Sequence, residues 1–507
     1  MPTSSPVAPV LATILRNTSA TTGAKVVDIA VRLLLIPLVI ATLGLERFGI
    51  WSLCIAIVSY GGLMDGGLDS ALSPFVARYE AAGNRDGQRR TVATAAYFYG
   101  GIGLLLTAVA WLLADVLVTL FSMPTQYRAE AALVLRLAAV NFALANAATV
   151  FTAALQGLQR FGLTSASRTL YVLLMGGGSA IALHAGWGLP GLMVATLGAT
   201  AVSGLCSAGA VLVLLPHVRL RPRDCSPATL RELLSFGSRI WVSKMASLVI
   251  GYTDRLFVGA ALSVSVLGLY EVGAKIAFSI RDIALLGTAP VIPAASRLSA
   301  TGERAALRQL YERGMDIIAA AVLPLFLFVG LMAPAVLQLW VGSAFPVSQT
   351  VCRILLAGCA LSVLMLYSAS VSTGAGRPEM QMWYAVTAVA AQLVLLPLAV
   401  NAFGWIGGAA ATATTIALGA AVFFALFFRH GFGSPVALAA SLAGPVIIAV
   451  AAAAPVVLLG LVATPESRLD AAGQLALAGI LFSAPYGLLT WLLIRLRTGR
   501  ATGGSQA

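Results

Sequence analysis

Residues 189–215 read LPGLMVATLGATAVSGLCSAGAVLVLL and contain no charged side chain. As a helix rising about 1.5 Å per residue, this stretch is long enough to cross the hydrocarbon core of a bilayer, which is about 30 Å thick. Similar runs recur along the chain, whose 507 residues are 59% hydrophobic and only 10% charged. Soluble domains carry roughly 25% charged residues, so this composition excludes a water-soluble protein. The alternating pattern of outer-membrane strands is absent, which leaves an all-α, polytopic membrane protein.

The apolar runs divide the chain into about fourteen predicted transmembrane helices. The first six are predicted near residues 15–43, 48–77, 92–121, 129–157, 168–185 and 189–215. The next six are predicted near residues 233–260, 265–296, 314–340, 347–373, 379–402 and 405–428, and two more near 436–462 and 472–495. We therefore expect an N-terminal six-helix half at 1–216, a C-terminal six-helix half at 217–430, and two additional transmembrane helices with a cytoplasmic tail at 431–507.

The orientation of these helices follows from the distribution of arginine. Arginines cluster in alternate loops, such as those at residues 78–90, 219–231 and 297–313, while the intervening loops offer little beyond Arg47 and a few others. Because basic residues favour the cytoplasmic side of a membrane protein, we expect the basic loops and both termini to be cytoplasmic. This asymmetry also accounts for the net charge of +13 without a nucleic-acid partner.

A sequence pattern in the first half returns in the second. The segment Pro74-x-x-x-Arg78-x-x-x-x-Gly83-x-Arg85-x-x-x-Arg89 recurs from Pro293 to Arg308, and Lys25 and Lys244 have the same separation as Pro74 and Pro293. Leu43-Gly44-Leu45-x-x-Phe48-Gly49 resembles Leu267-Gly268-Leu269-x-x-Val272-Gly273 at a slightly larger separation, which predicts a longer first loop in the second half. An even number of helices separates the copies, so they are parallel repeats. Repeats of this kind surround a central cavity, and transporter sites lie at their interface.

Charged side chains inside the predicted helices mark the candidate site, because each costs roughly 2.5–3.5 kcal/mol at the middle of a bilayer. In the first helix, Lys25, Asp28 and Arg32 share one face with Thr18 and Thr21. That face must therefore contact protein or water rather than lipid. The same charges argue against interpreting this segment as a cleaved signal peptide.

The first two helices of each repeat carry most of these charges, and we expect them to line one central cavity. The cations predicted to bind an anionic headgroup are Arg32, Lys244, Arg281, Lys25 and Lys275. The carboxylates predicted to act in coupling or gating are Asp28, Asp65, Asp69, Asp254, Glu271 and Asp282. The alternative is that the charges form ion pairs that lock the helices. It stays open for Lys25–Asp28 and Glu271–Lys275, whereas we favour binding for Arg32, Lys244 and Arg281.

Several classes of activity lack their sequence signals. The chain has no G-x-x-x-x-G-K-[ST] motif, which argues against nucleotide hydrolysis. Its three histidines and five cysteines show no metal-ligand spacing, so we expect no metal and no cofactor. The predicted outer loops are too short for the catalytic site of a membrane glycosyltransferase, ligase or polymerase. We therefore do not expect an enzyme.

Several short motifs resemble those of polysaccharide-biosynthesis flippases of the multidrug/oligosaccharidyl-lipid/polysaccharide exporter superfamily. Phe48-Gly49-Ile50-Trp51 and Asp65-x-Gly67-Leu68-x-x-Ala71-Leu72 are similar to the family's first two helices. Asp254-Arg255-x-x-x-Gly259 and Pro290-x-x-Pro293 resemble its seventh and eighth helices. Gly374-x-Gly376-Arg377-Pro378 is similar to the loop after its tenth helix.

The resemblance implies a flippase that moves a polyprenyl-pyrophosphate-linked oligosaccharide, an O-antigen or exopolysaccharide repeat unit, across the bacterial inner membrane by alternating access. It implies membrane lipids, a polysaccharide polymerase and glycosyltransferases as partners, and leaves coupling to a proton or sodium gradient open. The nearest alternative is a lipid-linked peptidoglycan precursor flippase, which is similar in helix number. A cation-coupled multidrug exporter is less favoured, since that branch usually has twelve helices.

Overall fold

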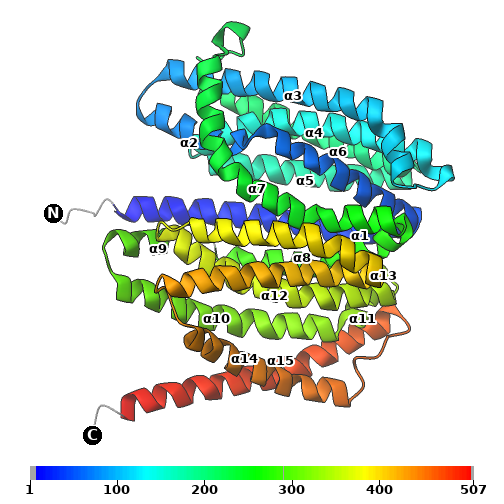
Figure 1. Cartoon of the computed structure of the whole chain (residues 1–507), viewed down its shortest axis with the longest axis vertical. Helices are drawn as coiled ribbons and strands as arrows, with labels where there is room; N and C mark the ends of the chain where they lie inside the picture. The colour runs from blue at the N-terminus through cyan, green and yellow to red at the C-terminus, as the bar shows by residue number, and fades with distance from the viewer. Residues whose placement is uncertain (1–6, 289–290, 504–507) are drawn as a thin grey trace. The chain divides into compact units, whose positions relative to one another are not determined.

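The computed structural model describes residues 7–288 and 291–503. Within these ranges the regular structure consists of fifteen α-helices and four short 3-10 helices, with no strand (Figure 1). Eleven helices of the described residues are long and apolar enough to cross a membrane. The predicted all-α, polytopic membrane fold is therefore confirmed.

The first of two compact units covers Met1–Gly268. Its helices are α1 (Val7–Ser59), η1 (Tyr60–Asp65), α2 (Leu68–Ala81), α3 (Arg85–Leu120), η2 (Thr125–Tyr127), α4 (Arg128–Gly157), α5 (Phe161–His184), α6 (Gly188–Leu214), η3 (Pro222–Asp224) and α7 (Pro227–Ala261). In this unit α4 packs between α3 and α6, and α5 packs against α6 and α1 (Figure 1). One core of buried apolar side chains joins α2, α3 and α4, with Leu72, Tyr99 and Val150 among its fully buried members.

The second unit covers Leu269–Ala507. Its helices are α8 (Val264–Leu285, of which the first turn belongs to the first unit), η4 (Leu286–Thr288), α9 (Val291–Ala300), α10 (Arg304–Leu331), α11 (Ala333–Val341), α12 (Pro346–Gly374), α13 (Glu379–Arg429), α14 (Pro435–Leu458) and α15 (Arg468–Gly503). The two C-terminal helices pack on the rest of this unit, α14 against α10 and α15 against α11. The pair predicted at 431–507 therefore forms helices as expected.

Two of the long helices are each broken by a glycine. Gly44 in α1 has φ +83° and ψ 168°, and Gly404 in α13 has φ +59° and ψ −136°. Glycine adopts a positive φ without the steric clash that a side chain would cause. Each break lies between two predicted helices, so α1 and α13 each contain two of them. The exact number of fourteen membrane crossings stays a prediction.

Several of the helices predicted as single spans are interrupted in the structure. The helix predicted near 48–77 is divided by η1 and by the left-handed Gly66–Gly67 pair. The helix predicted near 265–296 divides into α8, η4 and α9, and the one near 314–340 into α10 and α11. Glycines stand at the first of these points (Gly66 and Gly67) and a proline at the last (Pro334), and the helix ranges predicted from the long apolar runs extend across them.

Corresponding residues of the two repeats have the same separation in sequence throughout. The prediction of a longer first loop in the second half is therefore wrong. Gly268, the predicted counterpart of Gly44, lies inside α8, whereas the junction between α7 and α8 is at Leu262 and Ser263. Ser263 follows Gly44 at the same separation that relates Pro293 to Pro74, and Gly44 breaks α1 at the corresponding place. The junction between α7 and α8 is therefore short.

The compact units divide at Gly268 rather than at the predicted boundary after residue 216. The difference arises because α7 packs against α1, α2 and α3 of the first unit. The division into repeats at 1–216, 217–430 and 431–507 describes sequence similarity rather than packing, and it stays a prediction.

Candidate functional site

A partly buried ion-pair cluster joins α7 to η1 and α2. The Lys244 Nζ lies 2.5 Å from Asp65 Oδ2 and 3.1 Å from Asp69 Oδ2. Asp65 is only 3% exposed, and its other oxygen accepts a 2.9 Å hydrogen bond from the Gly67 amide. The Tyr99 hydroxyl of α3 donates to Asp65 Oδ2 at 3.4 Å. The buried carboxylate thus has partners from α7, from α3 and from the turn before α2, as a buried charge requires.

Glycines place these residues within reach of one another. Gly66 and Gly67 have φ of +59° and +79°, which turns the chain between Asp65 and α2. A Cβ atom at Gly67 would overlap the carbonyl oxygen of Gly237, so the start of α2 approaches the α7 backbone closely. One turn further along α7, Trp241 Nε1 donates a 2.7 Å hydrogen bond to the Leu63 carbonyl. Lys244 lies about one helical turn after Trp241 and contacts the two carboxylates.

A second ion-pair cluster joins α1 to α5. Asp28 accepts hydrogen bonds of 2.7 Å from both Arg32 Nε and Arg168 Nη2. Asp28 is 8% exposed, whereas the arginine side chains are 44% and 54% exposed. Among the described residues Asp28 pairs with Arg32 and Arg168, and not with Lys25, the partner that the sequence had left open. Lys25 is exposed and makes no ion pair among the described residues.

The sequence pattern does not identify Arg168 as a partner of Asp28. It lies in the second turn of α5, where only the packing of α5 against α1 brings it to Asp28. Three hydroxyl groups that bridge these elements were also missed. The Tyr60 hydroxyl in η1 and the Thr253 hydroxyl in α7 are 2.5 Å apart, and Tyr99 lies beside Asp65. These hydroxyl groups carry no charge, so the pattern of charged residues that marks the candidate site does not point to them.

The remaining predicted site residues are distributed over both units. In the first unit, Asp254 is 1% exposed and accepts a 2.8 Å hydrogen bond from the Arg255 amide. In the second unit, Arg281 Nη2 lies 2.9 Å from Asp282 Oδ1 and over the ring of Phe278. Glu271 is buried and Lys275 is partly buried in α8. A central cavity shared by these residues and those of the first unit stays a prediction.

The clusters have a clear chemical consequence. The three cations favoured for headgroup binding, Arg32, Lys244 and Arg281, each contact a carboxylate. An anion that binds Lys244 must therefore compete with Asp65 and Asp69, or these carboxylates must first be protonated. The predicted roles in binding, coupling and gating stay predictions.

Comparison with known proteins identifies the family. Residues 39–349, more than half of the chain, match the sequence profile of the family described as "Polysaccharide biosynthesis protein". The chain belongs to this family. A Shigella flexneri relative named "Putative O-antigen transporter" is 23% identical over 398 residues, which cover 76% of this chain and 91% of the relative.

The fold of this protein is also found in solved structures of transporters. An inward closed structure of the lipid II flippase MurJ aligns with a TM-score of 0.75 and 9% identity, over 95% of this chain and 100% of that one. An inward-facing multidrug transporter of the MATE family aligns with a TM-score of 0.66 and 18% identity, over 79% of this chain and 95% of that one. The chain is therefore a membrane protein that shares the fold of these transporters.

Proposed function

We propose that this protein flips a polyprenyl-pyrophosphate-linked oligosaccharide, an O-antigen or exopolysaccharide repeat unit, across the bacterial inner membrane by alternating access. The observation that carries the proposal is the match to the polysaccharide biosynthesis family over residues 39–349. The Shigella flexneri relative, named as an O-antigen transporter and covered over 91% of its length, supports the same substrate class. A polysaccharide polymerase and glycosyltransferases are the expected partners.

The ion-pair clusters supply chemistry that suits this substrate. A pyrophosphate oxygen can replace a carboxylate oxygen as the acceptor for the Lys244 ammonium, and charge-assisted hydrogen bonds of this kind are strong. The Arg32 side chain, 44% exposed, keeps donors available beyond its bond to Asp28. Proton uptake by Asp69, which is more exposed than Asp65, would loosen its hold on Lys244 and favour the incoming anion. This exchange would couple transport to a proton gradient, and a sodium ion held by the same carboxylates is the alternative.

A lipid-linked peptidoglycan precursor flippase is the second candidate. The alignment with MurJ favours it, because it covers 95% of the chain and so includes the C-terminal helices. The multidrug transporter aligns with a smaller share of the chain, 79%, which makes a drug exporter the less favoured function.

Reconstituted transport distinguishes these candidates. The full-length protein is placed in proteoliposomes that contain either a fluorescent polyprenyl-pyrophosphate oligosaccharide or fluorescent lipid II, and quenching by an impermeant reductant reports flipping. We expect protein-dependent flipping of the oligosaccharide lipid and much slower flipping of lipid II. Faster flipping of lipid II would replace the proposal with the second candidate. In cells, deletion of the gene should remove the surface polysaccharide, and an unchanged polysaccharide in a strain without a redundant flippase would contradict the proposal.

A further inference from the structure

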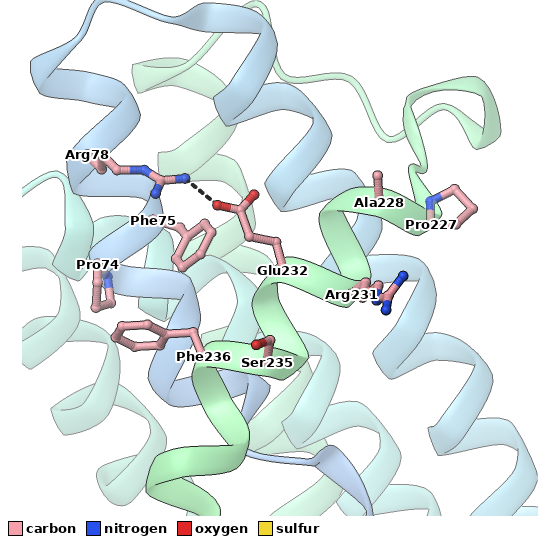
Figure 2. Close-up of a pocket in the computed structure, with 9 residues that line it drawn as sticks. All are labelled: Pro74, Phe75, Arg78, Pro227, Ala228, Arg231, Glu232, Ser235 and Phe236. Carbon is pink, nitrogen blue, oxygen red and sulfur yellow. Dashed lines mark hydrogen bonds and ion pairs between the residues drawn. The ribbon is translucent and has the colours of Figure 1, made fainter.

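A groove on the first unit lies between the C-terminal half of α2 and the first three turns of α7 (Figure 2). Its volume is about 800 Å³, and its walls include Phe75, Arg78, Arg231, Glu232 and Phe236. Below the groove, the contact between Gly67 and Gly237 holds the two helices close together. The groove is therefore bounded by two helices whose separation is fixed by backbone contact.

The groove has an aromatic floor. The rings of Phe75 and Phe236 pack edge to face with their centroids 5.8 Å apart. Phe75 is buried, but Phe236 is 38% exposed and presents apolar surface to the groove. Pro74 and Pro227 extend the apolar wall at either side. Such a floor suits a hydrocarbon chain better than a soluble anion.

The rim of the groove carries two guanidinium groups and one carboxylate. Arg78 lies over the Phe75 ring at 4.4 Å, and its Nη2 bonds Glu232 at 2.9 Å and the Tyr79 hydroxyl at 3.1 Å. Both bonds use one nitrogen, so the Nε and Nη1 hydrogens remain available. Arg231 is exposed and has no ion-pair partner among the described residues, and Figure 2 shows its guanidinium turned away from Glu232. The rim therefore has a net positive charge and unused donors.

We propose that this groove binds an anionic phospholipid, with the headgroup phosphate on the unused donors of Arg78, an acyl chain along Phe75 and Phe236, and Arg231 adding a second positive charge at the rim. Guanidinium groups bind phosphate through paired hydrogen bonds, and the aromatic floor matches the apolar part of the same molecule. The neighbouring segments are also basic, with Arg219, Arg221 and Arg223 in the linker before α7. Basic segments at a membrane surface attract anionic lipids. The lipid would span the groove and brace α2 against α7.

Glu232 distinguishes binding of the lipid phosphate from nonspecific apolar binding in the groove. Its carboxylate already bonds Arg78, so it competes with the lipid phosphate for that guanidinium. Removal of the Glu232 charge should therefore strengthen lipid binding, whereas removal of either arginine should weaken it. A groove that merely retained lipid by apolar contact would respond to none of these changes.

Native mass spectrometry of the full-length protein tests the site with two lipids of identical chains, phosphatidylglycerol and phosphatidylcholine. We expect saturable binding of phosphatidylglycerol and weaker binding of phosphatidylcholine. Arg231→Gln should weaken phosphatidylglycerol binding about fivefold, because a basic side chain near an anionic membrane surface contributes about 1 kcal/mol. Arg78→Gln combined with Arg231→Gln should weaken it further, and Glu232→Gln should strengthen it. Ser235→Trp, which fills the groove without changing its charge, should abolish it.

The matched control is Arg85→Gln with Arg90→Gln, two exposed arginines outside the groove that make the same change in net charge. The proposal requires this control to bind phosphatidylglycerol as the unchanged protein does. Equal losses in the control and in the groove variant would show a general charge effect and overturn it. Displacement of the lipid by millimolar glycerol phosphate would also overturn it, since a soluble headgroup would then suffice. Arg231 makes no ion pair among the described residues, so Arg231→Gln tests the site even if Arg78→Gln fails to fold.

Discussion

Gly49 of α1 and Gly268 of α8 lie against each other in a reciprocal backbone contact. A Cβ atom at Gly49 would overlap the carbonyl oxygen of Val264, and one at Gly268 would overlap the carbonyl oxygen of Leu45. Gly49 and Gly268 have the same separation in sequence as Leu45 and Val264, and it is the separation of the internal repeat. The two contacts are therefore the same contact seen from each repeat. A local two-fold axis therefore relates these two segments, and each repeat contributes one glycine to the contact.

Alanine at either glycine should destabilise the protein. Each new methyl group would meet a backbone oxygen, which cannot move aside as a flexible side chain can, so the two segments must separate. Overpacking of this kind typically costs about 1–3 kcal/mol. We expect Gly49→Ala and Gly268→Ala each to lower the thermal unfolding temperature measured in detergent. The control is Gly101→Ala in α3, where a Cβ would meet nothing within 4 Å. Unfolding temperatures equal to that of the control would show that the contact does not constrain the fold.

The sequence predicted the helices well because each is an apolar run bounded by polar residues. It also revealed the repeat, from the matching segments that start at Pro74 and Pro293. It could not reveal which charged residues meet. Lys25 and Arg32 both lie about one turn from Asp28 on the same helix, and only the side-chain arrangement selects Arg32. Arg168 joins them through the packing of α5 on α1, and no local pattern encodes a contact across 140 residues.

The stability of the loop that precedes α7 should depend on pH through His217. Its Nε2 donates a 2.9 Å hydrogen bond to Gln88 Oε1. Partial burial, followed by repulsion from Arg85, lowers the pKa of His217 below its usual value of 6.5. The folded protein therefore binds this proton less readily than the unfolded chain does. The stability that depends on neutral His217 is fully present above about pH 6.5 and is lost as the pH falls through the lowered pKa.

His217→Gln tests this pH dependence. We compare unfolding temperatures of the two proteins between pH 5 and pH 8. The unchanged protein should lose stability relative to the variant as the pH falls below about 6.5. A difference that stays constant over this range would contradict the role of His217. His430→Gln is a suitable control, because His430 is exposed and bonds only its own helix, at the Leu426 carbonyl.

The predicted topology can be tested at two exposed positions, Arg85 and Arg304. Each lies at the start of a helix, α3 or α10, in a basic loop that the distribution of arginine assigns to the cytoplasm. In a background without the five native cysteines, Arg85→Cys and Arg304→Cys should react with an impermeant maleimide only after the cells are opened. Arg468→Cys, in a loop predicted to face outward, should react in intact cells. Labelling of Arg85→Cys or Arg304→Cys in intact cells would reverse the orientation.

Substitutions in the cluster of Lys244, Asp65 and Asp69 distinguish a substrate-binding role of Lys244 from a purely structural one. Lys244→Gln leaves Asp65, which is 3% exposed, without its cation. Breaking a buried ion pair in this way typically costs about 3–5 kcal/mol, so the abundance of the variant should fall. Asp65→Asn in the same chain removes the buried charge and should restore abundance. If Lys244 only locks α7 to η1, the double variant should also regain transport. If Lys244 contacts the pyrophosphate, as we propose, the double variant should be abundant and still fail to flip the oligosaccharide lipid in proteoliposomes.

Asp65→Asn alone, which keeps Lys244 beside Asp69, is the matched control and should retain more transport than the double variant. Equal flipping by the double variant and the unchanged protein would refute the binding role of Lys244.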